Sequence, residues 1–266
     1  MSFLDDVGLT ATAGDEFTAT LHPTWRSMVG IHGGYVAAVT TAAVLRSVDP
    51  GRALRNLDVQ FTRPPTEGPI TIRTEPVSAG RTMTFTRAVA TQRGRPVLIA
   101  TAVLGTDRGG LEFDEVAKPS WAGSPPPPSA ERFVGTEPGH HFEQLDLRLE
   151  PGLRIFGHHA TARVAGWLRP IDPGEPITTP WLVCAADAMP PSMVFRTDRP
   201  VQAASIAMSI QLVAPAPGAV PAGSTVFLDA RTSISSRGFL VEDGTIWSPD
   251  GTILATSRQL RLSGVD

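Results

Sequence analysis

Short runs rich in Val, Ile, Thr and Phe, in which apolar and polar positions alternate, cover much of this chain. Alternation with a period of two is typical of strands that bury one face, and turn-forming clusters such as PPTEG, SAG and QRG separate the runs. The first half of the chain therefore predicts one early strand followed by a four-stranded antiparallel meander. The predicted strands are 16–22, 54–63, 69–77, 81–92 and 96–106.

The segment from Gly33 to Val48 has a different pattern, because it is apolar almost all round and contains neither proline nor acid. It stops just before Asp49-Pro50-Gly51, a cluster that ends helices. A helix that is apolar on every side is typical of a buried position. The segment therefore predicts a helix inside the sheet.

The second half of the chain repeats this order: a strand at 159–170, an apolar stretch at 180–195, then strands at 203–213, 224–235, 238–247 and 252–262. The segment SAGRTMTF resembles SISSRGFL, and VLIAT resembles TILAT. The spacing from Arg81 to Arg237 is 156 residues and that from Ala100 to Ala255 is 155. Offsets that agree so closely indicate duplication of a whole module.

The segment between the two halves is rich in Gly and charge and contains the run Pro125–Pro128, which cannot join the interior of a sheet. We therefore divide the chain into an N-terminal module at 1–106, an extended connector at 107–150 and a C-terminal module at 151–266. The predicted fold class is α+β, with two fused repeats that each wrap an antiparallel sheet around a central helix. Edge-to-edge pairing of the two sheets would remove exposed strand edges.

Composition excludes several classes of function. The net charge of −3 and the lack of a Lys/Arg cluster argue against a nucleic-acid partner. A single cysteine, Cys184, excludes an internal disulfide or a multi-cysteine zinc site and fits a reducing compartment; core burial is the favoured role for this thiol. The acidic N-terminus and the lack of a long apolar run predict neither a signal peptide nor a membrane span, so we expect a cytoplasmic protein.

Asp187 is the first candidate for chemistry, because it stands among apolar residues of the second helix-like stretch, where burying a carboxylate is costly. Capping of a backbone end near Pro190-Pro191, or exposure to solvent, would explain the residue equally well. The first predicted helix carries no acid. This asymmetry predicts one active centre per chain.

Ser205 and Gln259 lie in predicted strands, where the register decides whether each points to the core or to solvent. Gln259 stands at the repeat position that Leu104 holds in the first half. Either residue alone is more typical of a solvent-facing position.

The tetrad Ile31-His32-Gly33-Gly34 begins the first predicted helix, where backbone N–H groups can receive an oxyanion or a carbonyl oxygen. A plain turn into the helix is the alternative. The chain lacks the P-loop lysine, the GxGxxG fingerprint and the GxSxG elbow. His158-His159 forms a poor chelating pair, and we predict no metal site.

Several motifs together resemble the double-hotdog acyl-CoA thioesterases of the type II, thioesterase-like superfamily, over nearly the whole chain. They are W-x-x-x-x-G-x-H-G-G-Y at 25–35, V-Q-F-x-R-P at 59–64, A-G-W-L-R at 165–169, A-A-D-A-M-P-P at 185–191 and A-T-S-R-Q at 255–259.

The resemblance implies a catalytic trio of Asp187, Ser205 and Gln259, with Ser209 as an alternative source of the hydroxyl. Asp187 would polarise a water that attacks the thioester, while N–H groups around Gly33 and Gly34 would polarise the thioester oxygen. The candidate substrate-binding residues are His32, Gly33, Gly34, Tyr35, Arg81 and Arg237. Arg81 and Arg237, with Arg63, are candidates for the CoA phosphates, although an arginine at a strand end is more often simply solvated. The resemblance implies an acyl-CoA substrate, as in fatty acid metabolism, and implies no separate cofactor.

Two other functions remain on the same fold. A protein that binds an acyl group or acyl-CoA without hydrolysing it would have no need for the trio to converge on one water site. A hydratase or dehydratase ranks last, since no Asp-x-Asn-Pro-x-x-His segment is present. Remaining strand edges and helix-free sheet faces lead us to expect a homodimer or higher homo-oligomer.

Overall fold

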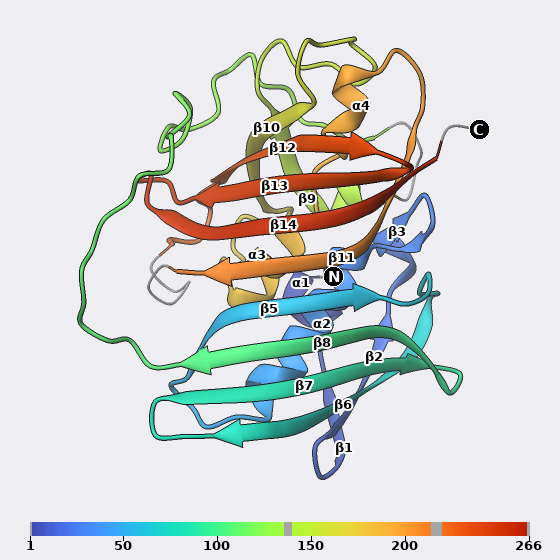
Figure 1. The fold of residues 1–266 in the computed structure, drawn as a ribbon, viewed down its shortest axis with the longest axis vertical. Coiled ribbons are helices and arrows are strands. Elements are labelled where there is room, and N and C mark those ends of the chain that lie inside the picture. The colour runs from blue at the N-terminus through green and yellow to red at the C-terminus, as the bar shows by residue number, and fades with distance from the viewer. Residues whose placement is uncertain (1, 136–139, 214–219, 265–266) are drawn as a thin grey trace.

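The fold is dominated by one large antiparallel sheet (Figure 1). The computed structural model describes residues 2–135, 140–213 and 220–264. Within them, helices and 3₁₀ turns are α1 (Phe3–Asp6), η1 (Pro23–Trp25), α2 (Gly33–Arg46), η2 (His141–Gln144), α3 (Thr179–Ala185) and α4 (Met193–Arg196). No helix of these described ranges is long and apolar enough to cross a membrane.

The sheet contains twelve strands in the order β1-β2-β6-β7-β8-β5-β11-β14-β13-β12-β10-β9, and β3 pairs with β4 in a separate small sheet. The strands of the first half are β1 (Thr10–Ala13), β2 (Glu16–Leu21), β3 (Arg26–Ser27), β4 (Gly30–Ile31), β5 (Ala53–Phe61), β6 (Gly68–Ala79), β7 (Met83–Gln92) and β8 (Arg95–Gly105). Those of the second half are β9 (Leu145–Leu149), β10 (Arg163–Pro170), β11 (Gln202–Leu212), β12 (Val226–Ser236), β13 (Phe239–Trp247) and β14 (Ile253–Gly264).

The strand order is symmetric about its centre, where β5 of the first half pairs antiparallel with β11 of the second. Outward from this junction, β8, β7 and β6 follow on one side and β14, β13 and β12 on the other. The duplicated modules therefore join edge to edge, as the repeat predicts. Joining them in this way gives each central strand a partner for its backbone hydrogen bonds on both sides.

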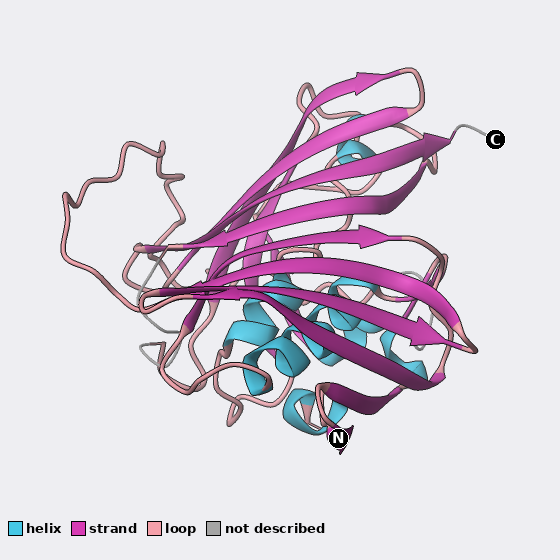
Figure 2. Ribbon diagram, turned by 60° about the horizontal axis from the view of Figure 1, so that its bottom comes forward, coloured by secondary structure: helices cyan, strands magenta, loops and turns pink. Residues whose placement is uncertain are grey.

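Helix α2 packs directly against α3 beneath the sheet, and Figure 2 shows the helices gathered on one face. The predicted buried helix is present, since ten of the residues of α2 are buried. Two threonines lie in this buried segment, and their hydroxyls donate to helix carbonyls: Thr40 to Val36 O and Thr41 to Ala37 O. The hydroxyls are thereby satisfied without water.

Two local expectations need correction. The apolar stretch at 180–195 does not form one helix: α3 ends at Ala185, and Asp187 lies in the turn that follows. Pro190 and Pro191 explain the break, because proline lacks the N–H that a helix needs and restricts the residue before it. Residues 145–149 of the predicted connector form β9, which pairs with β10 at the edge of the sheet.

Candidate active site

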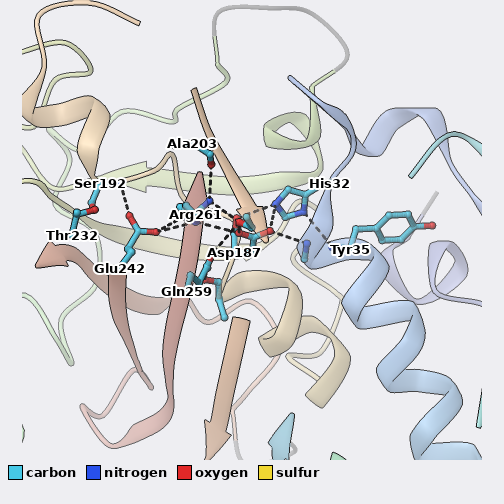
Figure 3. A network of polar contacts seen from close by, with 12 residues as sticks. His32, Tyr35, Asp187, Ser192, Ala203, Thr232, Glu242, Gln259 and Arg261 are labelled. Carbon is cyan, nitrogen blue, oxygen red and sulfur yellow. Dashed lines mark hydrogen bonds and ion pairs between the residues drawn. The ribbon is translucent and has the colours of Figure 1, made fainter. Parts of the chain in front are cut away.

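Asp187 lies at the junction of the two modules, and its side chain is only 5% exposed. Its Oδ2 accepts a hydrogen bond from Gly34 N at 2.9 Å, across the interface between the halves. Its Oδ1 lies 3.1 Å from Ser205 Oγ and 3.2 Å from Arg261 Nη2. Donors from three separate parts of the chain therefore surround this carboxylate, as Figure 3 shows.

Ser205 and Gln259 come to Asp187 from the paired strands β11 and β14. The Ser205 hydroxyl lies 3.0 Å from Gln259 Oε1, and Gln259 Nε2 donates to Ala186 O at 3.0 Å. That second bond determines which way the Gln259 amide points, so that its oxygen faces the serine. The three residues of the predicted trio thus lie together.

A β-bulge decides between Ser205 and Ser209. In a regular strand, residues four apart point to the same face, so Ser205 and Ser209 would lie on one face if there were no bulge. The register of β11 shifts between Ser205 and Ala207, so Ser205 pairs with the buried Arg261, whereas Ser209 pairs with the exposed Arg258. Ser209 Oγ accepts from Gln211 Nε2 at 2.7 Å, on the other face of the sheet. The structure therefore places the Ser205 hydroxyl, and not that of Ser209, beside Asp187.

The glycine pair at the N-terminus of α2 predicts two backbone N–H donors for a substrate oxygen, but only one of them is available. Gly34 N–H is bound to the Asp187 carboxylate, so it orients that side chain instead of facing a substrate oxygen. Gly33 is partly exposed, and no partner for its N–H is found among the described residues. A Cβ on Gly33 would lie 3.0 Å from the Phe61 ring and 3.2 Å from Asp187 Oδ2. One open helix-terminal donor therefore stands beside the carboxylate.

His32 caps α2 and supports the turn that carries Asp187. Its Nδ1 accepts from Tyr35 N at 3.2 Å, so Nε2 bears the proton and donates to Asp187 O at 2.9 Å. Burial lowers the pKa of His32 despite the opposing charge of Asp187. The ring is therefore neutral and acts by holding the Asp187 backbone.

Tyr35 points away from the cluster, as Figure 3 shows. Its hydroxyl donates to Asp6 O at 2.7 Å, and its ring stacks on Trp25 with centroids 4.7 Å apart. Burial, followed by the charge of Asp6, raises the pKa of this phenol. The structure brings Tyr35 to the N-terminal helix and not to Asp187.

The two predicted arginines belong to the β12–β13 and β6–β7 turns, which lie at opposite ends of the strands (Figure 1). Arg237 is in the β12–β13 turn; Phe239, which opens β13, pairs with Leu262, next to Arg261 of the site. Arg81 is in the β6–β7 turn. Met83, which opens β7, pairs with Gly105 of β8, and Gly105 pairs in turn with Ala53 at the start of β5. The site lies near Phe61 at the other end of β5. The fold therefore brings Arg237 to the end of the sheet that holds Asp187 and leaves Arg81 far from it.

Sequence reasoning missed a buried ion pair beside the trio, Arg261 with Glu242. Their side chains are each 6% exposed, and Arg261 Nε lies 2.9 Å from Glu242 Oε1. The signal was available in β14: Arg261 follows Gln259 by two residues, so the two share a face of the strand. No cluster of three or more acidic, histidine or cysteine side chains suited to a metal occurs among the described residues.

A second buried histidine, His141, stacks on His32 with ring centroids 4.0 Å apart. Neither of its ring nitrogens makes a hydrogen bond within the described parts of the chain. Burial, reinforced by His32 and His140, holds the pKa of His141 well below its ordinary value of 6.5. The folded protein therefore contains two histidines that resist protonation behind Asp187.

The free energy of unfolding is expected to fall as pH drops below about 6.5, because the unfolded chain takes up protons that folded His32 and His141 refuse. The slope should approach about 1.4 kcal/mol per pH unit for each histidine. Urea unfolding between pH 7 and 5.5 measures it. The variant His141→Phe should lower the slope by the contribution of one histidine. His158→Asn, at an exposed histidine, should leave the slope unchanged. An unaltered slope in His141→Phe would contradict this assignment.

Comparison with known families and structures gives a consistent result. The family model of the acyl-CoA thioesterase N-terminal domain matches residues 21–105, and that of the C-terminal domain matches residues 116–262. No curated protein sequence matches closely enough to count as a relative.

Several solved structures share the fold along its whole length. A conserved protein of unknown function with a hot dog fold from Alicyclobacillus acidocaldarius is 27% identical, with 99% of this chain and 98% of that chain covered and a TM-score of 0.87. A suggested thioesterase II from Thermobifida fusca is 22% identical (98% and 99% covered, TM-score 0.83). The acyl-CoA thioesterase II TesB2 from Mycobacterium marinum is 18% identical (100% and 99% covered, TM-score 0.73). These matches confirm the predicted double-hotdog fold.

Proposed function

Since this chain belongs to the acyl-CoA thioesterase family and is a thioester hydrolase, we propose that it cleaves acyl-CoA to a free acid and CoA by direct attack of a water that Asp187, Ser205 and Gln259 hold. The observation that carries this proposal is the meeting of the three side chains at Ser205, whose Oγ lies 3.1 Å from Asp187 Oδ1 and 3.0 Å from Gln259 Oε1. A protein that only binds acyl groups has no need for such a cluster at a helix N-terminus.

The hydrogen-bonding capacity of the trio suits a bound water. Ser205 has one hydroxyl proton but two acceptors within reach, Asp187 Oδ1 and Gln259 Oε1. Whichever acceptor the serine does not use can accept a hydrogen bond from water. The serine, the amide and the carboxylate together can therefore orient a water molecule and take one of its protons.

The thioester oxygen would bind at Gly33 N–H, the open donor of α2. As the water oxygen bonds to the acyl carbon, negative charge moves to that thioester oxygen, where the helix N-terminus stabilises it. Asp187 takes the water proton. Collapse of the intermediate then breaks the carbon–sulfur bond, and the proton passes to the departing CoA thiolate.

Release of CoA thiol from a panel of acyl-CoAs of increasing length tests the proposal. A thiol reagent suits the assay, because the sole cysteine, Cys184, is buried and burial raises its pKa well above the ordinary range. We expect turnover by the parent and a loss on the order of 10² in Ser205→Ala. Ser209→Ala, on the opposite face of the same strand, is the matched control and should keep parental activity. Binding of acyl-CoA without thiol release from any member of the panel would instead favour an acyl-CoA-binding protein.

A further inference from the structure

Arg261 occupies the centre of the buried network, between the trio and a second carboxylate. Its Nη1 donates to Ser205 Oγ at 2.8 Å and to Ala203 O at 3.3 Å, and its Nη2 to Asp187 Oδ1 at 3.2 Å. Its Nε donates to Glu242 Oε1 at 2.9 Å. One rigid guanidinium therefore contacts two of the three proposed catalytic groups at once.

Glu242 is itself fixed from the side away from Arg261. Its Oε2 accepts from Ser192 N at 2.6 Å, and the Ser192 hydroxyl is 2.8 Å from Thr232 Oγ1. Both Glu242 oxygens are thus engaged, so the carboxylate is fixed in place beside the arginine. Burial disfavours the Arg261 cation, but Glu242 and then Asp187 outweigh that effect, and the pKa of Arg261 is raised.

The contact with Ser205 has a directional consequence. Because Arg261 donates to the serine oxygen, the hydroxyl proton must point elsewhere, toward Asp187 or Gln259. The arginine thereby holds the serine in the orientation that the proposed water-binding arrangement uses. A lysine at this position would supply charge but not the planar fork.

Titratable groups from every element packed against Asp187 face its side chain, but only some of them carry charge. His32 at the start of α2 is neutral, with His141 of η2 stacked behind it, and the Cys184 thiol of α3 stays protonated because its pKa is raised by burial. Arg261 of β14 supplies the nearby positive charge, and Glu242 of β13 balances it. The positive charge of Arg261 is therefore partly neutralised by Glu242, and its attraction for Asp187 is weaker than that of an arginine without a second partner.

We propose that Arg261 is a positioning residue for the hydrolytic site, and that Glu242 tempers its charge so that Asp187 remains an effective base. This inference rests on the proposed function. Without Glu242, the full charge of Arg261 would stabilise the ionised Asp187 and weaken its pull on the water proton.

The variant Glu242→Gln, assayed in the full-length protein with the best acyl-CoA of the panel, tests this. We expect the acid limb of the kcat/KM profile to move to lower pH by about one unit. The plateau of kcat should fall roughly three- to tenfold as the base weakens, with KM nearly unchanged. Asp243→Asn is the matched control, because Asp243 pairs with Arg258 on the exposed face of the same two strands and should leave the profile unmoved.

A double variant, Arg261→Gln with Glu242→Gln, gives a second test if the single variant folds poorly, because it removes the Arg261–Glu242 ion pair as a unit and leaves neither partner without the other. The acid limb of its kcat/KM profile should move to higher pH, because the lost Arg261 cation was nearer to Asp187 than the lost Glu242 anion. Its kcat should also fall, because Ser205 loses the hydrogen bond from Arg261. A pair with only a structural role would alter stability in both variants and move neither limb. Unmoved limbs would therefore overturn this inference, whereas an inactive parent would overturn the proposed function instead.

Discussion

Replacing Asp187 by asparagine is expected to lower kcat for acyl-CoA hydrolysis by about 10²- to 10⁴-fold, because an amide cannot take a proton from the attacking water. The amide nitrogen would also face a donor in either orientation: Gly34 N–H on one side, or Ser205 and Arg261 on the other. The effect should appear in kcat, with little change in KM, since the carboxylate acts in the transition state and not in binding.

Steady-state kinetics of Asp187→Asn and Asp187→Ala beside the parent measure this loss. Asp198→Asn, at an exposed acid in the loop after α4, serves as the control for the general effect of removing a negative charge. Urea unfolding of each variant separates a chemical defect from a folding defect. If both Asp187 variants kept kcat within a factor of about ten of the parent, a role for this residue in proton transfer would be excluded.

Adding a single methyl group at Gly34 is expected to damage both stability and activity. A Cβ there would lie 2.8 Å from Cys184 O, 2.8 Å from the His32 ring and 2.9 Å from Asp187 Cβ. The backbone of α3 cannot give way cheaply, so the start of α2 and the Asp187 turn must separate. That separation would break the 2.9 Å bond from Gly34 N to Asp187 Oδ2.

For Gly34→Ala we expect a destabilisation of about 1–3 kcal/mol, typical of overpacking, and a loss of kcat on the order of 10² from the displaced carboxylate. Urea unfolding and thiol release measure the two effects. Gly33→Ala is the graded comparison, because its new methyl meets mainly the Phe61 ring, a side chain that can turn aside. Parental stability and kcat in Gly34→Ala would contradict the close packing of α2 against α3.

Local patterns were enough to find most of the fold, because alternation and glycine or proline punctuation act over a few residues. The meander and its repetition follow from such patterns, and so does the buried helix at α2. The pattern failed in the second apolar stretch, where local apolarity cannot distinguish α3 from the irregular turn after it. There the paired prolines break the helix, and the turn points Asp187 at the other module.

Individual site residues were predictable only where a residue type was unusual for its position in the chain. Asp187 stood out because it is an acid in an apolar stretch, and Gln259 because it replaces an apolar residue of the repeat. The fold places Tyr35 and Arg81 away from Asp187, because adjacency in a motif, or equivalence in a repeat, does not bring residues to one end of a sheet. Glu242 carried no signal, since an acid in an alternating strand is typical of the solvent face.

The sequence by itself determined that this protein is a duplicated helix-and-sheet module with a carboxylate in its second half, since both facts are written in short-range patterns and an internal offset. Only the tertiary structure decided what that carboxylate meets. The bulge in β11 turns Ser205, and not Ser209, toward the core, and the pairing of β5 with β11 brings Gly34 of one half to Asp187 of the other. Register and long-range packing depend on many weak contacts distant along the chain, so no local pattern encodes them.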